Sequence, residues 1–522
     1  LVVDDLPDVR ATVVGMLSDE GYDVQEAATY DEAVDLLQKS RFHAAILDIR
    51  LEESDVENET GLQLMDFIHQ KDPTIVTVML TGYAQVHMIQ RAYSRDSQGK
   101  TPAYSFLQKS EIKKLPAVLT EAFTHTLRIN HELMIEDDGA VLESLAKGLR
   151  FQEKEKPEIP VLIDEIDELL RKLFFECERI QVTVPQRGYS AAAVFKVIPW
   201  YMERGLGEAL IVKIGERGVA DREVEKYREY VQGMVGGHRV PKAVDTTQTQ
   251  SLTGILYTFA GLGFIQDFSV YFESADKEAV QAVLRNLYLK TCRPWQRNAQ
   301  QSAAPIQLKQ VYLEHLWLTD EKLTYAVAHM MGKRHPFSMK GDGQILLGED
   351  NLIPNPADFV RKMSFEQPVL YSIIHGDLQG YNVLVDQHEE TWLIDFANTT
   401  KGPLAQDYAL FETYLLISVA LDQDWQTIYQ WHLALFSAGN LTAVPLSPTL
   451  AQQESISKAH AAVLTIRRLA FGDAVFLTEW EYLTAVLFNS LKLLTIMNLP
   501  AVQRDFALIA AALVAERLIQ NS

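Results

Sequence analysis

The chain has 522 residues, a length typical of about three domains. Its hydrophobic content of 47% and charged content of 23% are those of an ordinary soluble protein. The formal charge of −22 disfavours general binding to nucleic acid or to anionic membrane surfaces, because both need a basic surface.

Other simple features favour a cytoplasmic protein with no membrane partner. The sequence contains no apolar run of 18 residues and no pattern of a signal peptide. Cys177 and Cys292 match no metal or redox spacing, so we expect two buried thiols. The first expected strand begins at Leu1, and we expect that the natural chain starts earlier.

Residues 1–130 alternate short apolar strands with amphipathic helices. Strands are expected at 1–3, 44–47, 75–80 and 104–108, and such alternation predicts a parallel sheet covered on both faces. In a sheet of this kind the ligand site lies beyond the carboxyl ends of the strands. Polar residues follow each strand and should therefore converge: Asp4, Asp5, Asp48, Thr81 and Lys109.

This pattern resembles the receiver domain of two-component response regulators over about 125 residues, in the DD pair, LDIR, LTGYA and FLQKS. The resemblance implies that Asp48 accepts a phosphoryl group as a nucleophile. It implies Mg²⁺ on Asp5, Asp48 and the Arg50 carbonyl, supported by Asp4, since clustered carboxylates suit a hard cation. It also places Thr81 and Lys109 on the added phosphate and makes Phe106 an aromatic switch.

Two features depart from the receiver pattern. The loop after Asp48, residues 51–61, is longer and more acidic than usual, which would alter Mg²⁺ affinity or the choice of partner. Ser110 stands where the family often has Pro, and this changes the backbone expected after Lys109.

Residues 126–178 are expected to form a helical connector that ends in an amphipathic helix at 161–178. Two interpretations of this helix remain open. It is either a coupling or dimerisation helix, or a helix that covers the next domain.

From residue 179 the pattern changes to strands, with an antiparallel meander expected at 179–186, 191–201 and 208–216. The turn at 186–190 holds Gly188 and Ser190, whose backbone N–H groups are suited to phosphates. Lys213 lies in the third strand and Lys196 lies one strand earlier. Both are candidates for the lysine that would contact the phosphates. A helix at 220–231 and two further strands, at 239–247 and 252–263, are expected next.

Residues 371–396 place a polar turn between two short apolar strands. Asp377 and Asn382 are five residues apart, and Asp395 ends the second strand. Phosphoryl transfer from ATP requires such a set, with one acceptor for a hydroxyl proton and two oxygen ligands for Mg²⁺. The pattern HGDxxxxN, then IDF, then GPxxxD ending at Asp407 resembles the kinase-like phosphotransferases, the family of aminoglycoside, choline and fructosamine kinases.

The resemblance implies roles for single residues. Asp377 would be the catalytic base, Asn382 and Asp395 would bind Mg²⁺, and Asp407 would brace the catalytic loop. Gln379 stands where the family commonly has His, which affects the packing of the loop and the orientation of the acceptor.

For the first half of the same fold, the resemblance implies an ATP site. Lys213 would hold the phosphates and pair with Glu223, with Glu225 or Glu229 as alternatives. Gly188 and Ser190 would cover the phosphates, and residues 259–261 would be the hinge that bonds adenine.

The sequence therefore predicts a mixed α/β and α+β multidomain chain. Its parts are a receiver at 1–125 with a doubly wound, five-stranded parallel sheet, the connector at 126–178, and a bilobal protein-kinase-like fold at 179–522. We expect the small lobe at about 179–265 and the large lobe at about 266–522.

The expected function is a response regulator in which a sensor histidine kinase phosphorylates Asp48 and thereby controls an ATP- and Mg²⁺-dependent phosphotransferase. The acceptor is unknown, and the sequence leaves open whether the chain forms a homodimer. Two alternatives remain. One is a non-catalytic scaffold with a pseudokinase domain, and the other is a regulated small-molecule kinase, for which an acidic cleft would favour a cationic substrate.

Overall fold

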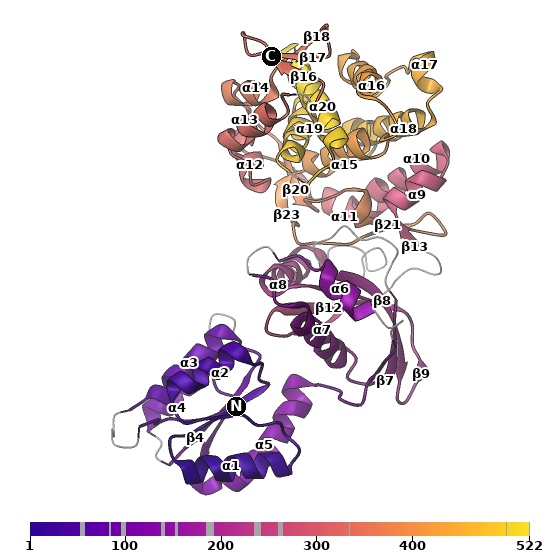
Figure 1. Ribbon diagram of the computed structural model, residues 1–522. Coiled ribbons are helices and arrows are strands. Elements are labelled where there is room, and N and C mark those ends of the chain that lie inside the picture. Colours follow the sequence, from indigo (N-terminus) through magenta and orange to yellow (C-terminus); the bar gives the residue numbers. More distant parts are fainter. Residues whose placement is uncertain are drawn as a thin grey trace. The chain divides into compact units, whose positions relative to one another are not determined.

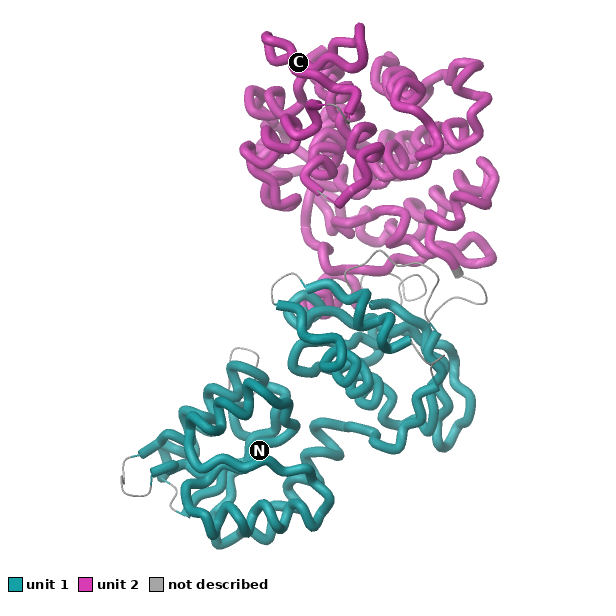
Figure 2. The backbone as a smooth tube through the Cα atoms, viewed as in Figure 1, with its two compact units in different colours: residues 1–221, 243–258 teal, residues 222–242, 259–522 magenta. Residues whose placement is uncertain are grey.

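The computed structural model describes residues 1–52, 58–82, 85–94, 101–136, 141–151, 155–183, 193–233, 242–258, 265–332, 335–496 and 498–520. These residues fall into two compact units, one formed by 1–221 with 243–258 and the other by 222–242 with 259–522 (Figure 2). The first unit holds a receiver-like part and an antiparallel sheet, and the second is mainly helical (Figure 1).

The first 125 residues form a five-stranded sheet in the order β2-β1-β3-β4-β5, with every pairing parallel. The strands are β1 (Val2–Val3), β2 (Glu26–Ala27), β3 (Ala44–Asp48), β4 (Val76–Thr81) and β5 (Ser105–Gln108). The helices are α1 (Pro7–Asp19), α2 (Tyr30–Lys39), α3 (Thr60–Lys71), α4 (Val86–Ala92) and α5 (Leu115–Glu121).

Side chains alternate between the two faces of this sheet, as strand geometry requires. Leu47 and Met79 pack with α2 and α3 in one core, whereas Ile46 and Val78 pack with α1 and α5 in the other. Both faces are therefore covered, and the predicted doubly wound parallel sheet is confirmed.

The rest of the first unit is a sheet in the order β11-β12-β10-β8-β7-β6, with β9 beside β8. Its strands are β6 (Met134–Glu136), β7 (Cys177–Thr183), β8 (Ala193–Tyr201), β9 (Gly205–Leu206), β10 (Leu210–Glu216), β11 (Ala243–Gln248) and β12 (Leu252–Thr258). The predicted antiparallel pairing of the meander is confirmed. The connector is not wholly helical as predicted, because β6 lies within it and pairs with β7 in parallel.

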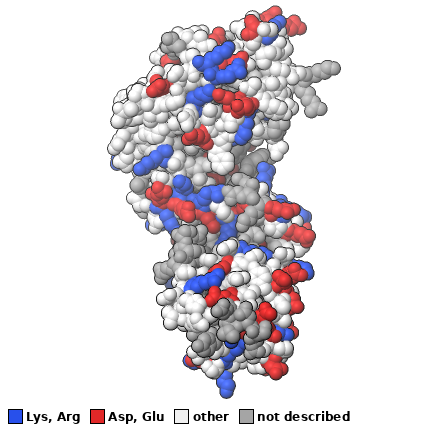
Figure 3. Space-filling view, turned by 90° about the vertical axis from the view of Figure 1, so that its left-hand side faces the viewer, with Lys and Arg blue, Asp and Glu red and all other residues white. Residues whose placement is uncertain are grey.

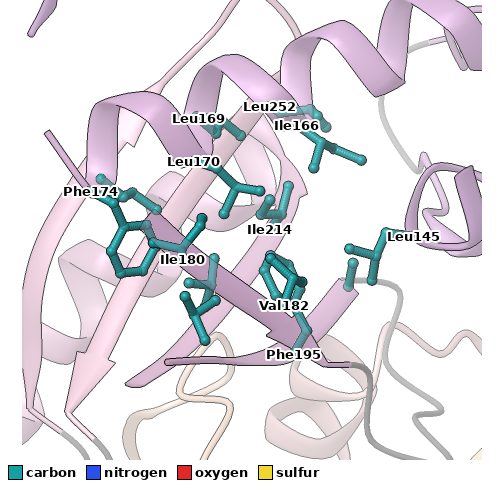
Figure 4. Close-up of a cluster of buried hydrophobic side chains, with 14 of the residues drawn as sticks. Leu145, Ile166, Leu169, Leu170, Phe174, Ile180, Val182, Phe195, Ile214 and Leu252 are labelled. Atoms are coloured by element: carbon teal, nitrogen blue, oxygen red, sulfur yellow. The ribbon is translucent and has the colours of Figure 1, made fainter. Parts of the chain in front are cut away.

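Helix α7 (Ile159–Leu173) covers one face of this sheet, as one of the two interpretations of the helix expected at 161–178 required. Its apolar side chains Ile166, Leu169 and Leu170 pack with Phe195 and Ile214 of the sheet (Figure 4). Helix α6 (Val141–Gly148) adds Leu145 to the same cluster. Because this face is apolar, the neighbouring residues on each strand are turned to the opposite face.

The second unit carries the polar turn that contains Asp377 between short strands, which pack on helices. Its first half contains α9 (Phe268–Ser274), α10 (Lys277–Asn286), η4 (Leu287–Thr291), α11 (Arg293–Gln296), α12 (Leu308–His315), α13 (Asp320–His329) and α14 (Pro356–Lys362). Its second half contains α15 (Ala405–Ser418), α16 (Trp425–Ser437), α17 (Pro448–Ala451), α18 (Glu454–Arg468), α19 (Glu479–Leu494) and α20 (Ala501–Gln520).

Short strands frame the turn that contains Asp377. β21 (Val383–Asp386) pairs with β13 (Ile265–Asp267) and β22 (Thr391–Leu393), and β20 (Leu370–Ile374) pairs with β14 (Gln300–Gln301) and β23 (Thr400–Pro403). Two smaller sheets are formed by β15 (Ile306–Gln307) with β19 (Glu366–Gln367), and by β16 (Phe337–Met339), β17 (Ile345–Leu347) and β18 (Asn351–Ile353).

The predicted order of kinase-like elements is therefore present, from an antiparallel sheet, through helix α8 (Arg217–Lys226), to a helical part with a polar loop between strands. Among the described residues, no helix combines the length and apolar character needed to cross a membrane. Acidic and basic side chains are interspersed on the face drawn in Figure 3.

Candidate functional site

Three carboxylates meet at the carboxyl edge of the parallel sheet. Asp4 and Asp5 follow β1, and Asp48 ends β3. One ligand oxygen from each of them lies within 4.8 Å of the other two. Oxygen atoms at this spacing are suited to a hard divalent cation such as Mg²⁺.

Lys109 lies between two of these carboxylates. Its Nζ atom is 2.7 Å from Oδ2 of Asp4 and 2.7 Å from Oδ2 of Asp48. Burial raises the pKa of Asp48 although the hydrogen bond from Lys109 opposes the shift. Burial alone would lower the pKa of Lys109, but its bonds to Asp4 and Asp48 raise it. The lysine therefore stays charged and balances the acidic cluster.

The remaining predicted receiver residues lie on the adjoining strands. Thr81 ends β4 with a side chain that is almost wholly buried. Phe106 of β5 is partly buried and packs against the core that contains Met79. Gly61 presses on the backbone of Asp48, where an added Cβ would stand 1.8 Å from the carbonyl oxygen. The site is thus held by strand ends and by close backbone packing.

Lys213 lies on β10, on the sheet face opposite α7. Its neighbours Val212 and Ile214 point into the apolar core under α7, so Lys213 points the other way. Lys196 lies on the same face as Lys213, because it pairs with Ile211 across the strands. Lys213 is 7% exposed whereas Lys196 is only partly buried, so burial favours Lys213 as the phosphate ligand.

Burial also separates the three candidate acids of the following helices. Glu223 of α8 is 2% exposed, whereas Glu225 and Glu229 are exposed to solvent. Glu223 is therefore the better candidate partner of a buried lysine. Gly188, Ser190 and the predicted hinge at 259–261 lie outside the described residues.

The loop between β20 and β21 holds Asp377 by side-chain amides. Nδ2 of Asn382 donates to the Asp377 carbonyl at 2.7 Å and to its Oδ2 at 3.0 Å. Nε2 of Gln379 donates to Oδ1 of Asp377 at 3.2 Å. Gln379 thus helps to orient this carboxylate. Because Asn382 uses its N–H groups on Asp377, its Oδ1 is the atom suited to a metal ion.

Asp395 lies at the same end of the β21–β22 hairpin as Asn382. Val383 pairs with Leu393, and the N–H of Ile394 donates to the carbonyl of Asn382 at 3.1 Å. Asp395 follows directly and has a left-handed backbone with φ of 69°. Such a conformation is costly for a residue with a side chain, and it turns the backbone sharply at the strand end.

Asp407 braces the turn before Asp377. Its two carboxylate oxygens accept the N–H groups of His375 at 2.8 Å and Gly376 at 2.9 Å. Burial raises the pKa of Asp407 to about 7, although these two bonds oppose the shift. Gly376 has φ of 78°, and an added Cβ would lie 2.3 Å from the carbonyl oxygen of Asn398. Only glycine fits this turn without displacing its neighbours.

One residue near this loop was not predicted. His315, at the end of α12, is hydrogen-bonded to the backbone of Gly376, and burial lowers its pKa. The sequence offered no signal for this contact, because residues 293–345 match no recognisable motif.

A family model described as the response regulator receiver domain matches residues 1–114. Residues 1–114 are a receiver domain. The nitrogen assimilation regulatory protein NtrX of Azorhizobium caulinodans is 33% identical over 133 residues, which are 26% of this chain and 27% of that protein. The chain thus spans about a quarter of the length of this relative. The receiver domain of NtrX from Brucella abortus is 29% identical and covers 24% of this chain and 98% of that one, with a TM-score of 0.20.

A second family model, described as Ternary complex associated domain 9, matches residues 326–475, a range that includes Asp377, Asn382, Asp395 and Asp407. An aminoglycoside-3'-phosphotransferase of type VIII is 18% identical and covers 63% of this chain and 98% of its own, with a TM-score of 0.32. At this level of similarity, the case for phosphotransfer depends on the geometry of residues 372–407 in this chain.

Proposed function

We propose that this chain is a two-component response regulator in which phosphorylation of Asp48 controls an ATP- and Mg²⁺-dependent phosphotransferase in the C-terminal part. The observation that carries the second half is the loop in which Asn382 and Gln379 hold Asp377 while Asp407 fixes the backbone before it. The proposed site in the cell is the cytoplasm, where a sensor histidine kinase would be the phosphodonor.

In the receiver, an oxygen of Asp48 would attack the phosphorus of a phosphohistidine. The new O–P bond forms as the N–P bond breaks, and the donor histidine is recovered. Asp4, Asp5 and Asp48 would hold Mg²⁺, which offsets the charge of the phosphoryl group. Lys109 contacts Asp48 and Asp4, and it would bind an added phosphate oxygen together with Thr81, which pairs with Gln108 on the neighbouring strand.

In the C-terminal part, Asp377 would take the proton from an acceptor hydroxyl. The acceptor oxygen bonds the γ-phosphorus as the bond to the β–γ bridging oxygen breaks, and ADP leaves. Asn382 and Asp395 would hold Mg²⁺, whereas Lys213, paired with Glu223, would bind the phosphates together with Gly188 and Ser190. Such catalysis depends mainly on positioning and charge, which the bonds around Asp377 support.

A second candidate function is a signalling scaffold with a silent kinase-like domain. The family model over residues 326–475 favours it, because the name of that family refers to association in a ternary complex. In that case the same loop would stabilise a binding surface and would turn over no ATP. A regulated small-molecule kinase is a form of the first proposal in which the acceptor is a metabolite or a drug.

The deciding experiment measures ADP formation by the full chain with Mg²⁺ and ATP in a cell lysate that supplies acceptors. Replacement of Asp377 by Asn should lower turnover by about 100-fold or more, as loss of a general base does. Asp342→Asn is the control, because Asp342 is an exposed carboxylate in a turn remote from the loop in sequence.

Transfer of the label from ATP to a molecule of the lysate would identify the acceptor. If the parent chain binds ATP but forms no ADP with any acceptor, the scaffold replaces the enzyme as the proposed function. If Asp48→Asn accepts phosphate from acetyl phosphate as well as the parent does, the assignment of Asp48 is wrong.

A further inference from the structure

Glu168 of α7 joins the receiver to the antiparallel sheet within the first unit. Its Oε2 contacts Nη2 of Arg41 and lies 3.4 Å from Nε2 of His43, and its Oε1 lies 2.6 Å from Nζ of Lys172. Burial alone would raise the pKa of Glu168, but the bond from His43 and the charges of Lys172 and Arg41 lower it to about 2. The side chain is 11% exposed, so this is a partly buried ion cluster and not a loose surface pair.

Arg217 makes a second contact with the receiver. Its Nη1 lies 3.2 Å from Oδ1 of Asp72, with side chains that are 11% and 7% exposed. The same Nη1 donates to the carbonyl of Thr249 in the β11–β12 turn at 3.2 Å. Because Arg217 is the first residue of α8, this ion pair fixes the point where β10 passes into that helix.

These contacts lie at the receiver edge opposite the phosphorylation site. Arg41 and His43 precede β3, and Asp72 precedes β4, whereas Asp48 and Thr81 end the same two strands. Strands of five or six residues separate the two edges by roughly 15–20 Å. Gln250 of the β11–β12 turn lines a small pocket together with receiver residues that include Asp72, which extends the same interface.

On the side of the antiparallel sheet, the contacts involve helices α7 and α8. Helix α7 covers the sheet in which β10 carries Lys213, and α8 follows β10 directly. Helix α7 packs its apolar side against the sheet that contains β10 (Figure 4). Arg217 follows Lys213 by four residues and precedes Glu223 by six along α8. Lys213 and Glu223 are both buried while these contacts are made.

We propose that the ion pairs Glu168–Arg41 and Arg217–Asp72 form a clasp through which the receiver fixes α8 and so regulates the nucleotide site. The inference rests on the proposed function only for its second half, the effect on ATP. A closed clasp holds the start of α8, the helix that carries Glu223, and an open clasp releases it and weakens ATP binding.

The test opens the clasp from the receiver side with the double variant Arg41→Gln and Asp72→Asn in the full chain. Asn at position 72 keeps the Oδ1 atom that accepts two bonds from Thr74, so the receiver turn stays intact, while the charge that attracts Arg217 is lost. The matched control is Asp66→Asn, which removes an ion pair with Arg91 that lies wholly within the receiver.

Hydrogen exchange is measured on segment 217–226 in the absence of nucleotide. We expect the amides of α8 to exchange about ten-fold faster in the double variant and unchanged in Asp66→Asn, because local opening follows the loss of the local contacts. Labelling of Asp48 by acetyl phosphate should be the same in all three proteins, which shows that the receiver is folded.

ATP binding by the same proteins separates the two proposals. We expect a dissociation constant for Mg²⁺-ATP about five-fold higher in the double variant than in the control, as for a helix start that has lost its anchor. If α8 exchanges at the parental rate in the double variant, the clasp is wrong whether or not ATP binds. If α8 responds but no protein binds ATP, the clasp stands and the proposed function fails.

Discussion

The two acidic sites of this chain hold their carboxylates with different kinds of partner. In the receiver, Asp4 and Asp48 share the ammonium group of Lys109 at 2.7 Å from each. In the loop after β20, Asp407 is held by two backbone N–H groups, and Asp377 accepts the side-chain amides of Asn382 and Gln379. One site is balanced by a full charge, and the other is oriented by dipoles.

The difference suits different chemistry. In the proposed reaction, a phosphoryl group on Asp48 would bring negative charge, and Lys109 already contacts Asp48. If Asp377 acts as the proposed base, it must stay in one orientation, and the amide groups of Asn382 and Gln379 hold it there. Substitutions that remove the partners of these carboxylates should therefore change the stability of the two sites by different amounts.

The largest expected effect is in the loop. Asp407→Ala leaves the N–H groups of His375 and Gly376 without their acceptors, and each buried orphan costs about 1–3 kcal/mol. We expect the free energy of opening of residues 372–384 to fall by about 4 kcal/mol, measured by hydrogen exchange. Asp407→Asn keeps one acceptor oxygen and should lose about half as much, and an equal loss in both variants would contradict this account.

The second effect depends on pH. The pKa of Asp407 is raised to about 7, above the ordinary value near 4, so the folded state binds a proton that the unfolded state has released. The contribution of Asp407 to stability is therefore fully present below about pH 4 and is lost as the pH rises through about 7. Relative to Asp407→Asn, the parent loop should lose a little under ~4 kcal/mol between pH 4 and 8.

The receiver should behave differently over the same pH range. Because the pKa of Lys109 is raised above its ordinary value of 10.5, its contribution persists until the pH passes that raised pKa. Hydrogen exchange of residues 372–384, at several pH values in the parent and in Asp407→Asn, checks the loop. If the free energy of opening differs between the two proteins by the same amount from pH 4 to 8, Asp407 does not titrate in this range and the prediction is wrong.

The smallest effect is expected from Lys109→Met. The variant leaves the carboxylates of Asp4 and Asp48 facing each other without their cation, so the receiver should lose about 2 kcal/mol at pH 7. Addition of Mg²⁺ should restore most of this loss, because the same oxygens are suited to the metal. Thermal unfolding with and without Mg²⁺ measures both effects, and a variant that Mg²⁺ does not stabilise would show that these residues hold no cation.

The sequence predicted those features that follow from local pattern. Polar residues at strand ends converge as expected in the receiver, and the spacing of Asp377 and Asn382 is realised as a direct hydrogen bond. Strand β6 escaped prediction because three residues are too few to show alternation. The sequence already preferred Glu223 to Glu225 and Glu229, and the burial of Glu223, which a sequence pattern does not reveal, agrees with that preference.

The contacts of Glu168 and Arg217 were also beyond the sequence. Each residue looks like an ordinary solvated charge on an amphipathic helix, and its partner lies more than 120 residues away. Local periodicity does not distinguish a charged side chain exposed to solvent from one that forms an ion pair with another domain. His315 belongs to the same class, since its partner Gly376 is defined only by the fold.

The position of Arg41 and Asp72 on the receiver bears on whether receivers can be exchanged between regulators. Both residues lie in loops at the edge opposite Asp48, so the charges of the proposed clasp are separate from the residues proposed to accept phosphate. If the clasp operates as proposed, a receiver transplanted from another regulator would not act on α8 of this chain unless its two loops supplied the same charges. Under the proposed clasp, the receiver is specific for this chain because of Arg41 and Asp72, which lie at the edge opposite Asp48.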